Sequence, residues 1–354
     1  YFVGLPEMVI NFFTFVAEEV RERLAELGAR KLDDIIGRVD LLEAGPGQTE
    51  RQARLDLSPV LSDTGLADTA PQFCTDPRNT PFDKGELAEA MVAEMRDAIA
   101  NKTGGRFGFE VKNFNRSIGA RVSGEIARAH GNEGMAEAPL DVSLMGTAGQ
   151  SFGAFNVSGL NLSLIGDAND YVGKGMSGGK LVIRPPDNAG YVARETAIIG
   201  NTCLYGATGG TLYAAGRAGE RFAVRNSGAT AVIEGAGDHC CEYMTDGVVL
   251  VLGRVGVNFG AGMTGGFAYV FDMDRDFVDL YNHELIDIHR VSPESMEAYL
   301  HHLRALLTEH VEATDSEWGQ QILEDYRTFL PKFWVVKPKA AELGSLIESL
   351  RQAA

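Results

Sequence analysis

Short apolar runs of strand length recur through the middle of the chain, and glycines separate them. The runs read KLVI from Lys180, TAVIE from Thr230, VVLVLG from Val248 and FAYVF from Phe267. Their β-branched and aromatic residues favour strands, and their small or branched side chains suit the interior of a stacked coil.

The starts of these runs recur at a nearly constant spacing. Aligning Gly178, Gly209, Gly228, Asp246 and Gly265 gives separations of 31, 19, 18 and 19 residues. A step near 19 is about three sets of six, which is typical of a parallel β-helix whose rung has three short strands and three turns. Since parallel connections are nearly always right-handed, we predict a mainly β fold: a right-handed parallel β-helix with flanking α-helical N- and C-terminal segments. The longer first step is expected to hold an extra partial rung over residues 195–203.

Helical periodicity opens the chain. Apolar residues recur every three or four positions between Pro6, which suits a first turn, and Gly28, which ends the pattern. The stripe is rich in phenylalanine, and we interpret it as a surface that packs against a neighbouring domain rather than as a cofactor box.

The remaining segments are predicted from the same kinds of pattern. They are a turn-rich connection over 41–82, a helix over 86–100, strands over 106–113 and 118–130, and a last helix that Ser292 opens and whose apolar positions run from Met296 to Val311. The chain accordingly divides into three regions: a helical segment with its connection over 1–82, the glycine-rich β-helix with its lead-in elements over 83–290, and a helical tail over 291–354.

The glycines contain the literal spacing Gly173-x-Gly175-x-x-Gly178, which resembles a dinucleotide-binding turn. That site requires a helix directly after the glycines, whereas a short β-prone run ending at Pro185 comes next here. The same pattern returns at Gly260, and two nucleotide sites are a poorer interpretation than two turns of one coil. We therefore assign the glycines to corners that need φ > 0 and close backbone approach.

Composition narrows the classes of partner. The formal net charge is −17, which argues against nucleic acid and an anionic membrane surface. No segment approaches the ~20 apolar residues of a membrane span, and no signal peptide opens the chain. A start at Tyr1 suggests a processed product or an excerpt from a longer chain.

The four cysteines show no metal-ligand spacing. Cys240 and Cys241 lie beside His239, but adjacent residues on a strand point to opposite faces, so we expect buried thiols rather than a metal site. We expect these two thiols, and those of Cys74 and Cys203, to be reduced, which favours a cytoplasmic setting. A further set of histidines is expected on solvated helical faces rather than in a metal site: His283, His289, His301, His302 and His310.

The best candidate binding patch is Asp167, Asn169, Asp170 and Tyr171, in the stretch GDANDY. The competing interpretation is an Asx turn that satisfies local backbone groups at a corner. A β-helix enzyme would need clustered carboxylates with basic residues, and only His239 among the histidines lies within the coil body.

Four stretches carry a resemblance to a known family: AGQSFGAF from Ala148, GDANDYVGKGMSGG from Gly166, NTCLYGATGG from Asn201 and NFGAGMTGG from Asn258. Together they resemble the C-terminal glycine-repeat (GXGXG) domain of the glutamate synthase large (alpha) subunit. The first helix and the segment after it resemble the end of that enzyme's FMN-binding synthase domain. A related repeat in formylmethanofuran dehydrogenase would not bring that helical segment.

The resemblance implies a part of an enzyme that forms L-glutamate from L-glutamine and 2-oxoglutarate. It implies, elsewhere in that enzyme, FMN and a 3Fe-4S cluster, with FAD and 4Fe-4S clusters on a small NADPH-oxidising subunit. The partners would be that subunit and the amidotransferase, central and FMN synthase domains. No catalytic, cofactor-binding or metal-binding residue is carried over to this chain, and we expect a scaffold that spaces the amidotransferase and synthase domains. The alternatives are a stand-alone β-helix binding module or a separately encoded glutamate synthase domain protein.

Overall fold

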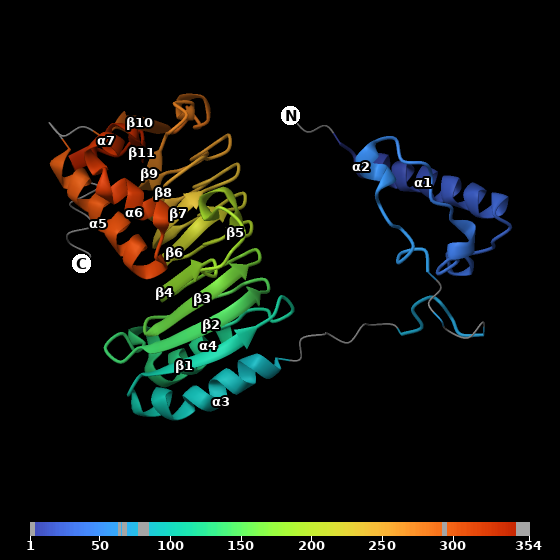
Figure 1. Ribbon diagram of the computed structural model, residues 1–354, viewed down its shortest axis with the longest axis horizontal. Helices are drawn as coiled ribbons and strands as arrows, with labels where there is room; N and C mark the ends of the chain where they lie inside the picture. The colour runs from blue at the N-terminus through green and yellow to red at the C-terminus, as the bar shows by residue number, and fades with distance from the viewer. Residues whose placement is uncertain (1–3, 63–64, 66–68, 77–84, 292–295, 345–354) are drawn as a thin grey trace. The chain divides into compact units, whose positions relative to one another are not determined.

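The structure is a computed structural model that describes residues 4–62, 65, 69–76, 85–291 and 296–344. The chain divides into two compact units, Tyr1–Pro81 and Phe82–Ala354 (Figure 1).

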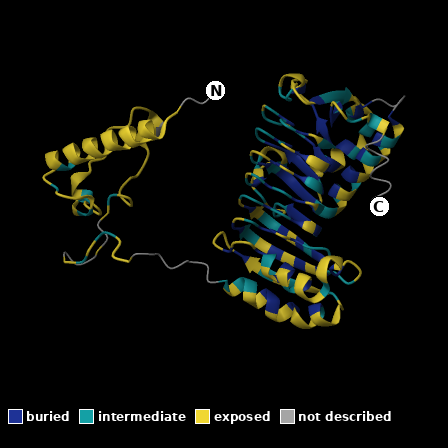
Figure 2. Ribbon diagram, turned by 180° about the vertical axis from the view of Figure 1, so that it is seen from behind, coloured by how far each residue is buried: buried dark blue, intermediate teal, exposed yellow. Residues whose placement is uncertain are grey.

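The N-terminal unit is built on one long helix. Helix α1 spans Pro6–Glu26, with proline in its first turn, and Gly28 lies just beyond its end at a φ of +73°. The predicted helix is therefore confirmed. None of its residues is buried, and Figure 2 shows it exposed along its length. The short helix α2 spans Glu50–Ala53.

The second unit is a parallel coil closed by helices and two antiparallel strands. Its helices are α3 (Glu86–Asn101), α4 (Ala120–His130), α5 (Glu297–Thr314), α6 (Glu317–Glu324) and α7 (Tyr326–Phe329). Its strands are β1 (Gly105–Val111), β2 (Leu140–Ala148), β3 (Leu160–Ala168), β4 (Ser177–Arg184), β5 (Ala197–Ile199), β6 (Gly209–Ala218), β7 (Ser227–Gly235), β8 (Thr245–Val251), β9 (Gly265–Phe271), β10 (Ile286–Arg290) and β11 (Phe333–Pro338).

One sheet runs through all the rungs in the order β1-β2-β3-β4-β6-β7-β8-β9-β11-β10, and its pairs are parallel from β1 to β9. Leu181 pairs with Leu212, Leu212 with Ala231, Ala231 with Val249, and Val249 with Ala268. These steps are 31, 19, 18 and 19 residues, so the predicted parallel coil and its register are confirmed.

The partial rung expected over residues 195–203 is also present, because β5 pairs with both β3 and β6. The rung itself differs from the prediction of three strands. Most rungs give one regular strand to the sheet, and among the described residues only β5 lies off that path. The rest of each rung is turn, because its backbone repeatedly adopts positive φ and so cannot continue as a strand.

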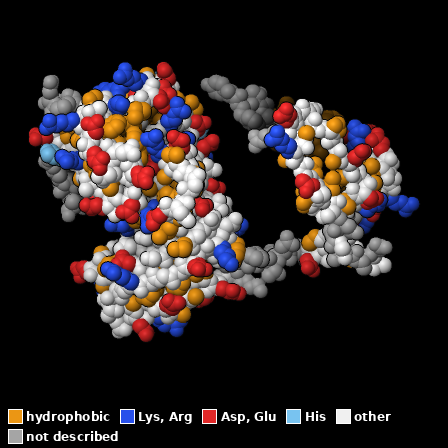
Figure 3. Space-filling model, in the orientation of Figure 1, with side chains coloured by type: hydrophobic (Ala, Val, Ile, Leu, Met, Phe, Trp, Pro, Cys, Tyr) orange, Lys and Arg blue, Asp and Glu red, His pale blue; other side chains and the backbone are white. Residues whose placement is uncertain are grey.

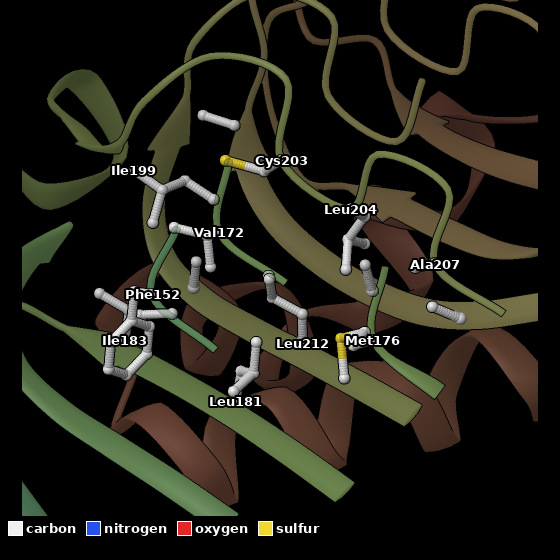
Figure 4. Packing of buried hydrophobic residues seen from close by; sticks show 14 of the residues in the cluster. Phe152, Val172, Met176, Leu181, Ile183, Ile199, Cys203, Leu204, Ala207 and Leu212 are labelled. Atoms are coloured by element: carbon white, nitrogen blue, oxygen red, sulfur yellow. The ribbon is translucent and has the colours of Figure 1, made fainter. Parts of the chain in front are cut away.

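In the later strands β6 to β9, side chains on both faces of the sheet are largely buried, whereas β1 to β3 bury mainly one face. Inside the coil, residues such as Leu181, Leu212 and Phe152 pack together from successive rungs (Figure 4). On the outer face of the later strands, Tyr213 and Tyr269 pack under α5 with Leu303. Burial of both faces explains why the later strands read as continuous apolar runs rather than as alternating ones.

Different elements cover the two ends of the coil. Strand β11 pairs antiparallel with β9 and with β10 at one end. At the other end α3 and α4 place Met91, Met95 and Ile126 in the core.

Helix α4 corrects the strand predicted over residues 118–130. Ile118, Val122 and Ile126 are buried and recur every fourth residue, which is a helical spacing. Their β-branched side chains favour a strand locally, but burying one face against the first rungs stabilises the helix instead.

Glycine is required at Gly179, where φ is +73° and a Cβ would meet the carbonyl oxygen of Leu160 and the side chain of Asn156. We predict that Gly179→Ala lowers the free energy of unfolding by about 2 kcal/mol or more, because it adds left-handed strain to a backbone clash. Gly124, exposed in α4 with nothing near its Cβ position, is the control, and Gly124→Ala should leave stability unchanged or raise it by about 1 kcal/mol. Urea unfolding of both variants measures the difference. Equal changes in stability for the two variants would contradict the requirement for glycine at Gly179.

Candidate functional site

Each rung turns through three residues of positive φ at alternating positions. In one rung these are Tyr171 (65°), Gly173 (66°) and Gly175 (63°). The first position recurs as Ser151, Thr202, Arg221, His239 and Asn258, and the third as Phe155, Gly206, Arg225, Tyr243 and Gly262. An L-residue in this region costs of order 1 kcal/mol, so a repeating set of such residues must be held by the stack.

Backbone hydrogen bonds through this corner join each rung to both of its neighbours. The N–H of Tyr171 donates to the carbonyl of Asn201 at 2.9 Å, and that of Gly173 donates in the opposite direction to Phe152 at 2.8 Å. The N–H of Gly175 donates to Tyr205 at 2.9 Å. The amides that a phosphate would need are already bonded to protein, so these glycines are scaffold.

Exposed aromatic rings lie over glycines of the following rung. A Cβ on Gly175 would lie 2.9 Å from the ring of Phe155, and one on Gly262 would meet the ring of Tyr243. Phe155 is 60% exposed and Tyr243 is 56% exposed. The glycines thus allow close backbone approach and also leave apolar rings on the outer surface of the coil. Figure 3 shows hydrophobic side chains in orange among the charged ones on one face of this unit.

The patch predicted at Asp167, Asn169, Asp170 and Tyr171 is part of this stack. Asp170 Oδ1 accepts a hydrogen bond from the N–H of Asn201 at 2.7 Å, and Asp167 Oδ1 accepts one from Thr147 Oγ1 at 2.9 Å. The partners lie on adjacent rungs, so these aspartates do not form the local Asx turn that was the competing interpretation. Lys174 lies 5.3 Å from the centre of the Tyr171 ring.

Side chains at positions equivalent to Asp170 in later rungs make the same kind of hydrogen bond to the next rung. Asn201 Oδ1 accepts from the N–H of Glu220 at 2.8 Å, and Asp238 Oδ1 accepts from that of Val257 at 2.9 Å. These side chains therefore fasten successive rungs to one another, and this use accounts for Asp167 and Asp170 in GDANDY.

Cys240 and Cys241 are both buried, as predicted, but they do not point to opposite faces. Cys241 has a φ of 58°, so the strand rule does not apply, and the two sulfurs lie 3.8 Å apart. His239 Nδ1 accepts a hydrogen bond from Asn258 Nδ2 at 3.0 Å. Within the described part of the chain, no group of three or more His, Cys, Asp or Glu side chains is placed to hold a metal ion.

The prediction that the later histidines of the chain lie on solvated helical faces is wrong for His289, His302 and His310. His310 is fully buried on α5, His302 Nδ1 lies 3.1 Å from the hydroxyl of Tyr269, and His289 lies on β10. Burial lowers the pKa of His302. His301 on α5 is exposed, as predicted.

Sequence reasoning missed one buried polar cluster. Glu234 Oε1 accepts a hydrogen bond from Ser316 Oγ and lies 3.4 Å from His310 Nε2. The available signal was the carboxylate of Glu234 within TAVIE, an otherwise apolar run that favours a strand.

The corner geometry corresponds to a recognised sequence family. Residues 86–339 match the family described as GXGXG motif. The chain belongs to this family. In this GXGXG chain, the alternating positive-φ residues supply the physical reason for a motif with glycine at every second position.

Similar proteins are glutamate synthases. The chain is 48% identical to "Ferredoxin-dependent glutamate synthase 2" of Synechocystis over 95% of the chain and 22% of that protein. It is 48% identical to "Glutamate synthase [NADPH] large chain" of Azospirillum brasilense over 96% of the chain and 22% of the relative. It is 42% identical to "Glutamate synthase [NADH]" of Schizosaccharomyces pombe over 96% of the chain and 16% of the relative. The chain thus spans about a fifth of the length of these relatives.

Across the described residues, we find no helix with the length and apolar character needed to cross a membrane.

Thiol reactivity tests the interior of the coil. Burial raises the pKa of Cys203 to about 12 and also raises that of Cys240, which lowers the reactive thiolate fraction at pH 8. We predict that Ellman's reagent rapidly modifies one thiol in the folded chain, the exposed Cys74, and all four after unfolding. Cys74→Ser should remove the rapid phase. A second rapidly reacting thiol in the folded protein would show that the core is open.

Proposed function

We propose that this GXGXG chain is the C-terminal structural part of a glutamate synthase, where it holds the amidotransferase and FMN synthase domains at a fixed separation. The observation that carries the proposal is the rung-to-rung bonding of both strands and corners. A coil bonded in this way deforms little, and two active sites that exchange an intermediate need fixed geometry.

Exposed apolar side chains support such a role in each unit. On the coil, Met145 is 59% exposed and Val257 is 51% exposed, in addition to the corner rings. On α1 an apolar face that includes Phe12 and Phe13 is exposed. The apolar residues at the start of α1 lie together, and apolar surface of this kind is typical of protein interaction sites. We propose that other domains of the longer enzyme cover it and the exposed apolar residues of the coil.

The cofactors implied by the resemblance do not fit the described residues. An iron-sulfur cluster needs several cysteine ligands, whereas Cys240 and Cys241 form only a buried pair. The corner amides that could hold an FMN phosphate donate to neighbouring rungs instead. The proposal therefore places FMN and the 3Fe-4S cluster in other domains and assigns no catalytic residue to this chain.

The regions 1–82, 83–290 and 291–354 and the cytoplasmic location are retained as parts of the proposal. NADPH is also retained as the electron donor, with its electrons passing through a small subunit that carries FAD and 4Fe-4S clusters. The relatives named for ferredoxin and for NADPH are equally identical to the chain, at 48%. Assays of the longer enzyme with each donor decide this point.

Removal of one rung from the full-length enzyme tests the scaffold. Deleting residues 141–160 joins Leu140 to Asn161, the register partner of Asp141, and brings the two ends of the coil about 4.8 Å closer. We predict that glutamine hydrolysis and ammonia-dependent glutamate synthesis continue, while glutamine-dependent synthesis falls at least tenfold because the two sites are no longer aligned.

The controls for this deletion are Gly124→Ala, which leaves the rung spacing intact, and thermal unfolding of the shortened enzyme. Unchanged glutamine-dependent synthesis in a folded, shortened enzyme would contradict the proposal.

A further inference from the structure

A cavity of about 580 Å³ opens on the outer face of the coil. One wall is the segment 184–194, which continues from the end of β4 within the long 31-residue step, and the other is the junction of α5 and α6. Its floor includes the buried residues Ala215, Glu234, Thr314 and Ser316.

Glu234 is the unusual residue of this floor. It is 2% exposed and comes directly after the fully buried Ala231, Val232 and Ile233 on β7. A buried carboxylate is costly unless hydrogen bonds or opposite charges compensate it, so each of its oxygens needs a partner.

Only one of its two oxygens has such partners. Oε1 accepts from Ser316 Oγ and faces His310 Nε2, and Ser316 Oγ is itself fixed because it accepts the N–H of Gly319 at 2.9 Å. Among the described residues, no hydrogen bond or ion pair involves Oε2. Because Glu234 lines the cavity, this oxygen is the acceptor that the cavity offers to a ligand.

Apart from His310, which faces Glu234 Oε1, the basic side chains around the cavity have other acidic partners. Arg184 lies 2.6 Å from Asp187 and 4.0 Å from Asp315, so its charge is compensated. Arg194 lies over the Trp318 ring, 4.5 Å from its centre, and 4.0 Å from Glu195.

After these pairings Glu234 and Glu317 remain as carboxylates of the lining. Tyr191 adds an aromatic ring to the walls, and such rings attract cations, whereas the Trp318 ring is already in contact with Arg194.

We propose that this cavity binds a compact organic cation, a primary ammonium or a guanidinium group, with Glu234 Oε2 as its acceptor. The group is carried by a free small molecule or by a lysine or arginine side chain of another polypeptide segment. This site is independent of the scaffold role, because it requires no contact with the synthase domains.

Paired probes of equal shape test the charge requirement. Methylguanidinium and its neutral analogue methylurea are titrated into the isotopically labelled chain, and the indole N–H signals of its two tryptophans are recorded by NMR. We expect a saturable shift of Trp318, with Trp334 unchanged, and at least tenfold weaker binding of methylurea. Equal binding of the two probes, or no shift of Trp318, overturns the proposal.

Glu234→Gln keeps the size of the side chain and removes its charge, and should weaken methylguanidinium binding at least tenfold. Glu312→Gln, an exposed change on α5 outside the cavity, should leave it unchanged. Equal affinity of both variants overturns the proposal. If Glu234→Gln does not fold, the comparison of methylguanidinium with methylurea on the unaltered chain still decides.

A capped Gly-Lys-Gly peptide distinguishes the sources of the cation. Binding of this peptide as tight as that of methylammonium supports a side chain of another segment. Binding of methylammonium alone supports a small molecule, and binding of neither probe overturns the proposal.

Discussion

The structure depends on backbone hydrogen bonds that continue from rung to rung through the corners as well as through the strands. At the corner, the N–H groups of Tyr171 and Gly173 donate to opposite neighbours, so each rung is held from both sides. This arrangement requires positive φ at alternating positions. It also explains why glycine is frequent there and why other residues accept the same strain, since a stack with matched corners over-determines the conformation of each one.

The features set by the backbone could be predicted from the sequence. The register steps result from the spacing of Gly178, Gly209 and Gly228, because equivalent corners must stack directly on one another. The helix over Glu86–Asn101 and the partial rung at Ala197–Ile199 result from equally local patterns.

Features that depend on tertiary packing or on an unusual backbone conformation could not be predicted in the same way. The segment Ala120–His130 becomes a helix because its buried face covers the first rungs. The left-handed conformation of Cys241 turns its side chain inward beside Cys240, and no residue type at that position announces it. Glu234 was visible as a charge within an apolar run, but its partners His310, on α5, and Ser316, the N-cap of α6, are distant in sequence.

Hydrogen exchange at the corner amides is the most direct test of a coil bonded through its turns. The account predicts that the N–H groups of Tyr171, Gly173 and Gly175 exchange only through global unfolding, as slowly as those of Leu181 and Leu212 in the sheet. Fast exchange at the corners, with protection confined to the strands, would show that the turns are ordinary loops and would contradict the rigid scaffold.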